Sequence, residues 1–518
     1  MTEALHSHRR DVTVCRTNKH VVLAAHPPAS GYPARWSLGP MDYYVGLGIP
    51  IQAVFVFEPS PDQHDDLIPP ERLITAMSAL LDHHPHFSGR LRVDEQDHQP
   101  YITALGSGAE LIEAHCDQAL SSYQNLGDYI ITSFPKDLLS PYEPTPEYLA
   151  KHPFFAIQHT RFACGGVSLA VRVAHAVVDG VGFFSVVRDL RDIYNQLGRS
   201  DVPPPRLSHT PSLAGYMSDW ACRASPEEVR DARKVQPQQY QLVQDSLPSG
   251  SNGVTLSSDK TDKEVEDDKT PSIAEADPVV GRVLRFSAKQ QSELKSLAMD
   301  PCANEGEYIT TFDALCAYVL QQTYRARTSP TRLPSCSPNR CNFLTPSDWR
   351  KALNLPANHT PNTCFVNFCD LTPELVLDGP AHAIARAVHQ VSRSLSLADA
   401  KSQLRWLCAQ PDKSKAQLAF SYGDGSLLLS SWLKMDLYDA LSLSLAQKGP
   451  EERRIRPTVT FTPFTQVSLI DGLGYFLPIP PSSSMDGGAS SVDLALALKD
   501  SVWREMDRVP SNLYTIVG

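Results

Sequence analysis

The stretch LAVRVAHAVVDGVGFF, which begins at residue 169, carries residue types that could do acid–base chemistry. His175 ends a valine-rich apolar run of strand character, and Asp179 and Gly180 stand four and five positions later. A neutral imidazole can accept a proton from a hydroxyl or amine that attacks a carbonyl, and its solution pKa of about 6.5 suits the later return of that proton. A structural histidine at a strand end is the alternative interpretation.

Asp179 need not touch the reacting atoms. At a strand-to-helix turn its carboxylate can pair with an arginine from elsewhere in the chain and so hold the loop that presents His175. Gly180 would then give the backbone room for the turn. The predicted roles are therefore a general base and a partner that positions it.

The elements that must position these residues alternate between strands and helices. Periodicity and turn residues predict a strand over 50–58, a helix over 70–85, two strands over 153–175 joined at Gly165-Gly166, and a helix over 180–198. Further along they predict a strand and a helix over 279–298 with Ser287 as N-cap, helices over 310–327 and 378–396, strands near 426–433, 456–464, 467–478 and 491–498, and a short helix from 499. This mixture predicts an α/β or α+β fold.

One segment divides the chain. Residues 246–278 are rich in Ser, Asp, Lys, Gly and Pro and carry few large apolar side chains. Such a segment buries too little surface to order itself, which predicts a mobile linker. The expected domains are therefore 1–245 and 279–518, with the linker between them.

The composition excludes several classes of protein. The chain has 518 residues, of which 42% are hydrophobic and 20% charged, and a net charge of −11, which argues against a nucleic-acid partner. The 11 cysteines form no Cys-x-x-Cys pair, and no long apolar run indicates a membrane span or a secretory signal. A cytosolic protein is expected. His83, His84 and His86 cluster at a predicted helix end, where we expect a solvated turn and no metal site.

Several stretches together resemble the BAHD acyltransferases, especially the fungal branch that includes the trichothecene 3-O-acetyltransferases. AHAVVDG is similar to the His-x-x-x-Asp-Gly motif of that family. The resemblance continues in ERLITAMSALLDHHPHFSGRL from residue 71, TTFDALCAYVLQQTYRAR from 310, SSWLKMDLYDA from 430 and DGLGYFLP from 471. Their order and spacing run through nearly the whole chain.

The resemblance implies a fold and a set of roles. It implies two chloramphenicol-acetyltransferase-like domains, each a mixed sheet with flanking helices, and a tunnel between them with His175 at its middle. His175 would be the base, Asp179 its structural partner and Arg350 the arginine that pairs with Asp179. The indole N–H of Trp432, supported by the hydroxyl of Ser430, would face the oxyanion of the tetrahedral intermediate. A core tryptophan and a surface arginine are the alternative interpretations.

The sequence departs from the family pattern at two places. The family's second motif, Asp-Phe-Gly-Trp-Gly, is replaced by Leu441, Ser442, Leu443, Ser444 and Leu445. Leu-Ser alternation can form a strand where two glycines would have made a turn. Pro361-Asn362 stands where the family has Gly-Asn, so that corner is also expected to differ.

The leading hypothesis is an acyltransferase that moves an acetyl group from acetyl-CoA to a hydroxyl or amine of a fungal secondary metabolite. It implies no permanently bound cofactor, no metal, no membrane partner and a monomer. The alternatives are a member of the fold repurposed for isomerisation, cyclisation or binding, and an enzyme whose acyl donor is a carrier protein. A peptide-bond-forming condensation enzyme is disfavoured, because Ala174 stands where that class carries a second histidine.

Overall fold

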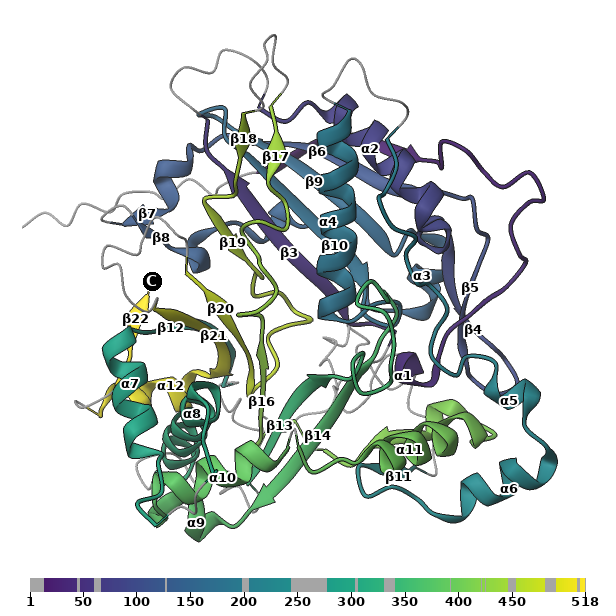
Figure 1. Cartoon of the computed structure of the whole chain (residues 1–518). Coiled ribbons are helices and arrows are strands. Elements are labelled where there is room, and N and C mark those ends of the chain that lie inside the picture. Colours follow the sequence, from purple (N-terminus) through teal and green to yellow (C-terminus); the bar gives the residue numbers. More distant parts are fainter. Residues whose placement is uncertain are drawn as a thin grey trace, which may run out of the picture.

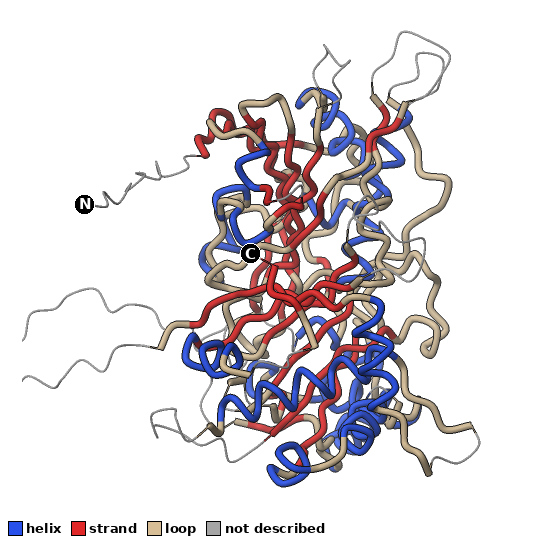
Figure 2. Tube along the Cα trace, turned by 90° about the vertical axis from the view of Figure 1, so that its left-hand side faces the viewer, coloured by secondary structure: helices blue, strands red, loops and turns tan. Residues whose placement is uncertain are grey.

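The computed structural model arranges the chain around two mixed sheets with helices against them, as Figures 1 and 2 show. It describes residues 14–43, 47–59, 67–125, 128–197, 205–243, 277–302, 306–329, 341–391, 393–420, 422–423, 425–445, 453–479, 491–509 and 513–517. The predicted α/β class is confirmed. The predicted linker 246–278 lies outside the described residues, apart from its last two positions.

The first sheet carries the predicted base at the end of one strand. Its strand order is β1-β6-β9-β10-β3-β19, and among these only β6 and β9 run parallel. The bounds are β1 Val14–Val22, β3 Pro50–Phe57, β6 Ala109–Cys116, β9 Phe155–Phe162, β10 Val167–Ala174 and β19 Val459–Phe461. The predicted turn between β9 and β10 contains Gly165 with φ of 83°, a conformation that glycine adopts without strain.

Two helices cover one face of this sheet. They are α2 (Pro70–His83) and α4 (Gly180–Gln196), and they agree with the predicted helices over 70–85 and 180–198 to within two residues at each end. Alternate residues of β10, such as Leu169, Val171 and Val173, join both helices in one buried cluster because side chains alternate across a strand. Burial of this face fixes where β10 ends and α4 begins.

The second sheet has the order β14-β13-β16-β20-β21-β12-β22. Its strands are β12 Val279–Phe286, β13 Cys341–Asp348, β14 Cys364–Leu371, β16 Leu427–Ser431, β20 Leu473–Pro478, β21 Val492–Lys499 and β22 Thr515–Val517. The helices beside it are α7 Ala288–Leu297, α8 Thr311–Arg327, α9 Pro373–Asp378, α10 Ala381–Val391 and α12 Asp500–Asp507. Ser287 caps α7 as predicted, and Thr310 caps α8 in the same way.

The two halves of the chain exchange segments. β19, from the second half, extends the first sheet beside β3, whereas β11 (Tyr240–Leu242) pairs with β15 (Ala416–Leu418). The helices α5 (Trp220–Arg223) and α6 (Pro226–Lys234) lie against α11 (Leu397–Ala409). The cluster under α2 and α4 also includes Val283, Trp432 and Ala495. One core therefore spans the junction at which the site lies.

The remaining elements are short and serve as covers and connections. They are α1 Pro40–Tyr43, α3 Pro146–Lys151, β2 Trp36–Ser37, β4 Arg90–Val93, β5 Pro100–Thr103, β7 Gln124–Asn125, β8 Asp128–Tyr129, β17 Leu443–Ser444 and β18 Arg454–Ile455. Within the described ranges, no helix has the length and apolar character needed to cross a membrane.

Candidate active site

His175 lies directly after β10, where its backbone is held from two sides. Its amide N donates to the carbonyl of Ile49 at 2.9 Å, and its own carbonyl accepts from Nδ2 of Asn362 at 2.8 Å. The side chain is partly accessible, whereas its Nδ1 is enclosed and has no hydrogen-bond partner among the described residues. Burial lowers the pKa of His175 below its ordinary value, and nearby carbonyls and the charge of Asp179 offset this only in part. The ring is therefore neutral at pH 7.

Asp179 connects three segments of the chain. Its Oδ1 accepts from the amide of Gly182 at 2.8 Å, which caps the first turn of α4. Arg350 donates to both carboxylate oxygens, from Nη2 at 2.8 Å and from Nη1 at 3.0 Å. The amide of Thr363 donates to Oδ2 at 2.9 Å. Asp179 and Arg350 are 2% and 3% exposed. The structure thus places Arg350 where the sequence predicted the partner of Asp179.

Arg350 is satisfied on every side. Its Nε donates to the carbonyl of His359 at 2.8 Å, Nη2 donates to that of Pro361 at 3.1 Å, and Nη1 donates to Asp348 at 2.8 Å. Burial alone would lower the pKa of Arg350, but Asp179 and Asp348 raise it above its ordinary value. Arg350 is thereby held in its charged form, and its bonds to the carbonyls of 359 and 361 order the segment that leads into β14.

Asp42 and Asn362 belong to the same network and were not predicted from the sequence. Nδ2 of Asn362 donates both to Oδ1 of Asp42 at 2.6 Å and to the carbonyl of His175. The amide of Gly39 donates to Oδ2 of Asp42 at 2.6 Å. Burial raises the pKa of Asp42 to about 7, although these hydrogen bonds lower it. Asp42 is 1% exposed and supports the main chain of His175 through Asn362.

Gly180 and Gly182 lie in the first turn of α4. At Gly182 the helix comes so close to a neighbouring backbone that no side chain would fit. A Cβ on Gly182 would lie 2.0 Å from the carbonyl oxygen of Thr360, so α4 packs directly on that backbone. Gly180 has no positive φ, and a Cβ there would meet only the flexible end of Met435 at 2.9 Å. The sequence predicted that Gly180 gives the backbone space for the turn. In the structure it is Gly182, and not Gly180, where a side chain would clash with the backbone.

Trp432 lies against the same helix. Its ring meets those of Phe184 and Tyr475 edge to face, each with centroids 5.4 Å apart, and its amide donates to the carbonyl of Phe476 at 2.9 Å. The indole N–H has no hydrogen-bond partner among the described residues. Ser430 is partly accessible on β16 and stands opposite Tyr475 in the sheet. Trp432 thus packs on α4, the helix that follows His175 in the chain.

The segment that replaces the second family motif is a short strand, as the Leu-Ser alternation predicted. Leu443–Ser444 forms β17 and pairs with β18. Asn195 of α4 donates to the carbonyl of Ser442 at 3.0 Å and accepts from the amide of Ser444 at 2.7 Å. Arg72 of α2 donates to the hydroxyl of Ser444 at 2.8 Å. The segment is therefore fixed to α2 and to the C-terminal end of α4 without any glycine.

The histidine cluster near residue 84 is not a solvated turn, so that prediction is wrong. His84 and His86 are 0% and 2% exposed, because the end of α2 packs under α4. Nε2 of His84 lies 2.8 Å from Oδ2 of the buried Asp189. No group of three or more His, Cys, Asp or Glu side chains in the described part of the chain is arranged to hold a metal ion.

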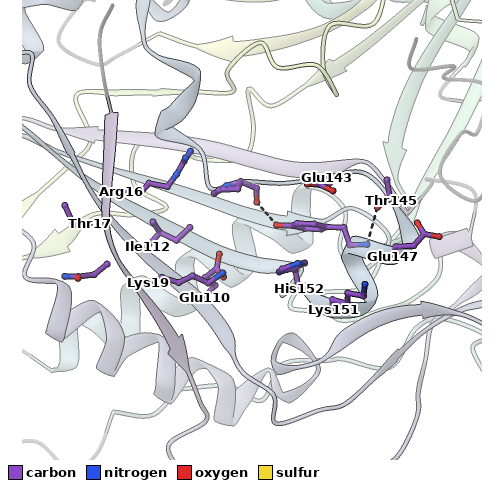
Figure 3. A pocket seen from close by; sticks show the side chains of 13 residues that line it. Arg16, Thr17, Lys19, Glu110, Ile112, Glu143, Thr145, Glu147, Lys151 and His152 are labelled. Atoms are coloured by element: carbon purple, nitrogen blue, oxygen red, sulfur yellow. Dashed lines mark hydrogen bonds and ion pairs between the residues drawn. The ribbon is translucent and has the colours of Figure 1, made fainter. Parts of the chain in front are cut away.

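A separate cavity of about 550 Å³ opens beside β1, β6 and α3 (Figure 3). Lys19 and Glu110 form a close ion pair in it, and the Tyr148 ring stacks on His152 with centroids 4.3 Å apart. None of the predicted site residues lines this cavity. It therefore has no part in the arrangement around His175.

Known proteins match most of the chain. A model of the Transferase family matches residues 12–440. Acyltransferase GLAUCE of Arabidopsis thaliana is 22% identical over 75% of this chain and 76% of that protein. Rosmarinate synthase of Plectranthus scutellarioides is 26% identical over 70% of this chain and 73% of that protein.

The fold is also found among solved structures. The structure of F. graminearum TRI101 complexed with coenzyme A and deoxynivalenol matches with a TM-score of 0.65 and 19% identity, over 93% of this chain and 100% of that chain. This likeness confirms the predicted two-domain fold.

Replacing Arg350 by leucine should destabilise the protein strongly. The variant leaves the Asp179 carboxylate buried and unpaired, which costs about 3–5 kcal/mol. Urea unfolding measures the loss. As control, Arg386→Leu removes an exposed ion pair and should cost less than about 1 kcal/mol. The double variant Asp179→Asn/Arg350→Leu should recover part of the loss, and wild-type stability of Arg350→Leu would contradict the assignment.

Asp42 should make the stability depend on pH. Its pKa of about 7 lies above the ordinary value of 3.8, so the folded state binds the proton more tightly and loses stability as pH rises from about 4 to 7. The free energy of unfolding of the wild type, relative to Asp42→Asn, should therefore fall between pH 5 and pH 8. Asp94→Asn is the control, because Arg35 lowers the pKa of Asp94 and its contribution changes only at more acidic pH. An unchanged difference for Asp42→Asn would disprove the shift.

Proposed function

Since this chain belongs to the Transferase family of acyl-transferring enzymes, we propose that it moves an acyl group from coenzyme A to a small natural product. The acceptor atom is a hydroxyl or amine, and an acetyl group on a hydroxyl of a fungal secondary metabolite is the specific case proposed. His175 is the general base. The structure of the TRI101 neighbour, complexed with coenzyme A and deoxynivalenol, supports a pairing of this kind of donor with a small-molecule acceptor.

The buried network behind His175 is the observation that carries the proposal. A general base must be neutral and fixed in place when the acceptor arrives. Burial keeps His175 unprotonated, and the bonds from Ile49 and Asn362 fix its backbone. Asp179 is fully occupied by Arg350, Thr363 and Gly182. It therefore acts as a positioning residue and does not share the proton of His175.

The proposed reaction is a direct transfer. His175 takes the proton of the acceptor as its oxygen or nitrogen forms a bond to the thioester carbon. The tetrahedral intermediate then breaks the carbon–sulfur bond, and the departing thiolate takes the proton from His175. The indole N–H of Trp432 is free to donate to the oxyanion, with Ser430 beside it as a weaker donor. No metal and no covalent acyl-enzyme take part in these steps.

His175→Ala should reduce turnover by about 100-fold or more, the usual scale for loss of a general base. Release of free thiol from acetyl-CoA, together with mass spectrometry of a panel of hydroxylated natural products, measures the transfer. Because burial lowers the pKa of His175, the wild-type rate should fall only below pH 6.5. His152→Ala, in the separate cavity, is the matched control. Near-full transfer by His175→Ala would remove the residue from the mechanism.

Trp432→Phe tests the oxyanion role. The substitution keeps an aromatic ring between Phe184 and Tyr475 but removes the N–H donor, so kcat should fall by about 100-fold while KM changes little. Trp406→Phe, at a buried tryptophan packed against Tyr240, should leave kcat unchanged and controls for loss of an indole. Wild-type kcat in Trp432→Phe would show that Trp432 only packs.

A further inference from the structure

Tyr475 faces the first domain from the second sheet. The strand pairing aligns Ser430, Tyr475, Ala495 and Val283 in one row across β16, β20, β21 and β12, so their side chains share a face. Val283 and Ala495 lie in the same buried cluster as Trp432, whereas the opposite face packs under α8 and α10. The Tyr475 ring therefore points to the junction where the proposed site lies.

Phe368 lies on the same face one row away. Across the sheet, Phe368 is paired with Leu344, and Leu344 with Leu428. Leu428 is in turn paired with Leu473. These last two residues stand two positions before Ser430 and Tyr475. The Phe368 ring lies 5.8 Å from that of Phe420.

Two further ring contacts belong to this group. Phe420 lies 5.2 Å from Tyr422 in an edge-to-face contact, and Tyr475 contacts Trp432. We name Phe368, Phe420, Tyr422 and Tyr475 the aromatic wall. Phe368, Phe420 and Tyr422 form one run of ring contacts, and Tyr475 meets Trp432 in another.

The wall is deep inside the molecule but not closed off. Burial raises the pKa of Tyr475 and of Tyr422 to about 12, and the two rings are close enough to influence each other. Both side chains nevertheless keep accessible surface. Within the described part of the chain, neither hydroxyl has a hydrogen-bond partner, and no charged group acts on either. Two neutral O–H groups are thus left without a partner among the described residues.

The wall lies beside the residues proposed to face the oxyanion. Tyr475 contacts Trp432 and is paired with Ser430 in the sheet. Phe368 lies on β14, the edge strand of the second sheet. Within the described residues no charged group acts on Tyr475 or Tyr422, so the wall suits an uncharged acceptor better than the phosphates of coenzyme A.

We propose that the aromatic wall binds the acceptor, and that this acceptor is an uncharged, flat ring system with a second hydroxyl or carbonyl group that reaches Tyr475 and Tyr422. Rings stack favourably on the faces and edges of the wall. A polar group at the far end of the acceptor pairs with hydroxyls that otherwise have no partner, whereas a charged group there would be desolvated without compensation. The inference rests on the acyl transfer proposed above and adds the class of its acceptor.

Binding of matched naphthols to the full chain tests the proposal. The probes are 2,6-dihydroxynaphthalene, which has a hydroxyl at both ends, 2-naphthol, which lacks one, and 6-hydroxy-2-naphthoate, which is charged at one end. Calorimetry should show the diol binding about tenfold more tightly than 2-naphthol, the scale of one hydrogen bond. The naphthoate should bind more weakly than either.

The variant Tyr475→Phe should remove the preference for the diol and keep the affinity for 2-naphthol, and Tyr422→Phe should reduce the same preference. Tyr308→Phe, at a tyrosine that is 62% exposed, is the matched control and should behave as wild type. An unchanged preference in both wall variants, stronger binding of the naphthoate, or no binding of either naphthol would each overturn the proposal.

Acetyl-CoA binding by the same samples separates the two proposals. It should be equal in wild type and both wall variants. Its absence from the wild type would reject acyl transfer from coenzyme A, while the naphthol affinities would still report on the wall.

Discussion

The buried ion pair between Asp179 and Arg350 is the interaction on which the site depends. Taking two charges out of water is costly, and the cost is repaid only where every donor and acceptor is satisfied. Here the carboxylate receives Arg350, Thr363 and Gly182, while the guanidinium also reaches the carbonyls of 359 and 361. The pair joins the start of α4 to the segment before β14. It therefore fixes the turn between His175 and that helix against both halves of the chain.

Much of this arrangement follows from the sequence because it is local. The end of β10, the start of α4 at Gly180 and the Leu443–Ser444 strand all depend on residues a few positions apart. Arg350 could be found only through the resemblance to a family, since 171 positions separate it from Asp179. No pattern in the sequence indicated Asp42, because its partner Asn362 lies 320 positions away and the two meet only in the folded chain. The burial of His84 was missed for the same reason, because its partner Asp189 lies on another helix.

The chemistry of the two sides of the site follows different rules. The side that holds the base is a buried polar network, in which Asp179, Arg350 and Asn362 each have at least two hydrogen-bond partners. The proposed acceptor side is built from rings, and its two hydroxyls have no partner within the described ranges. A buried network fixes one geometry for catalysis, whereas open donors on an aromatic surface select a ligand. The replaced motif at 441–445 belongs to neither, because Asn195 and Arg72 bind it as part of the scaffold.

Calorimetric titration of acetyl-CoA into the wild type and into His175→Ala tests the central claim most directly. The account predicts specific binding of one acetyl-CoA per chain at micromolar concentration to both proteins, because His175 acts on the acceptor and does not hold the donor. No heat of binding at millimolar acetyl-CoA in either protein would contradict transfer from coenzyme A. It would then direct the search to a carrier-bound acyl donor or to a reaction without acyl transfer.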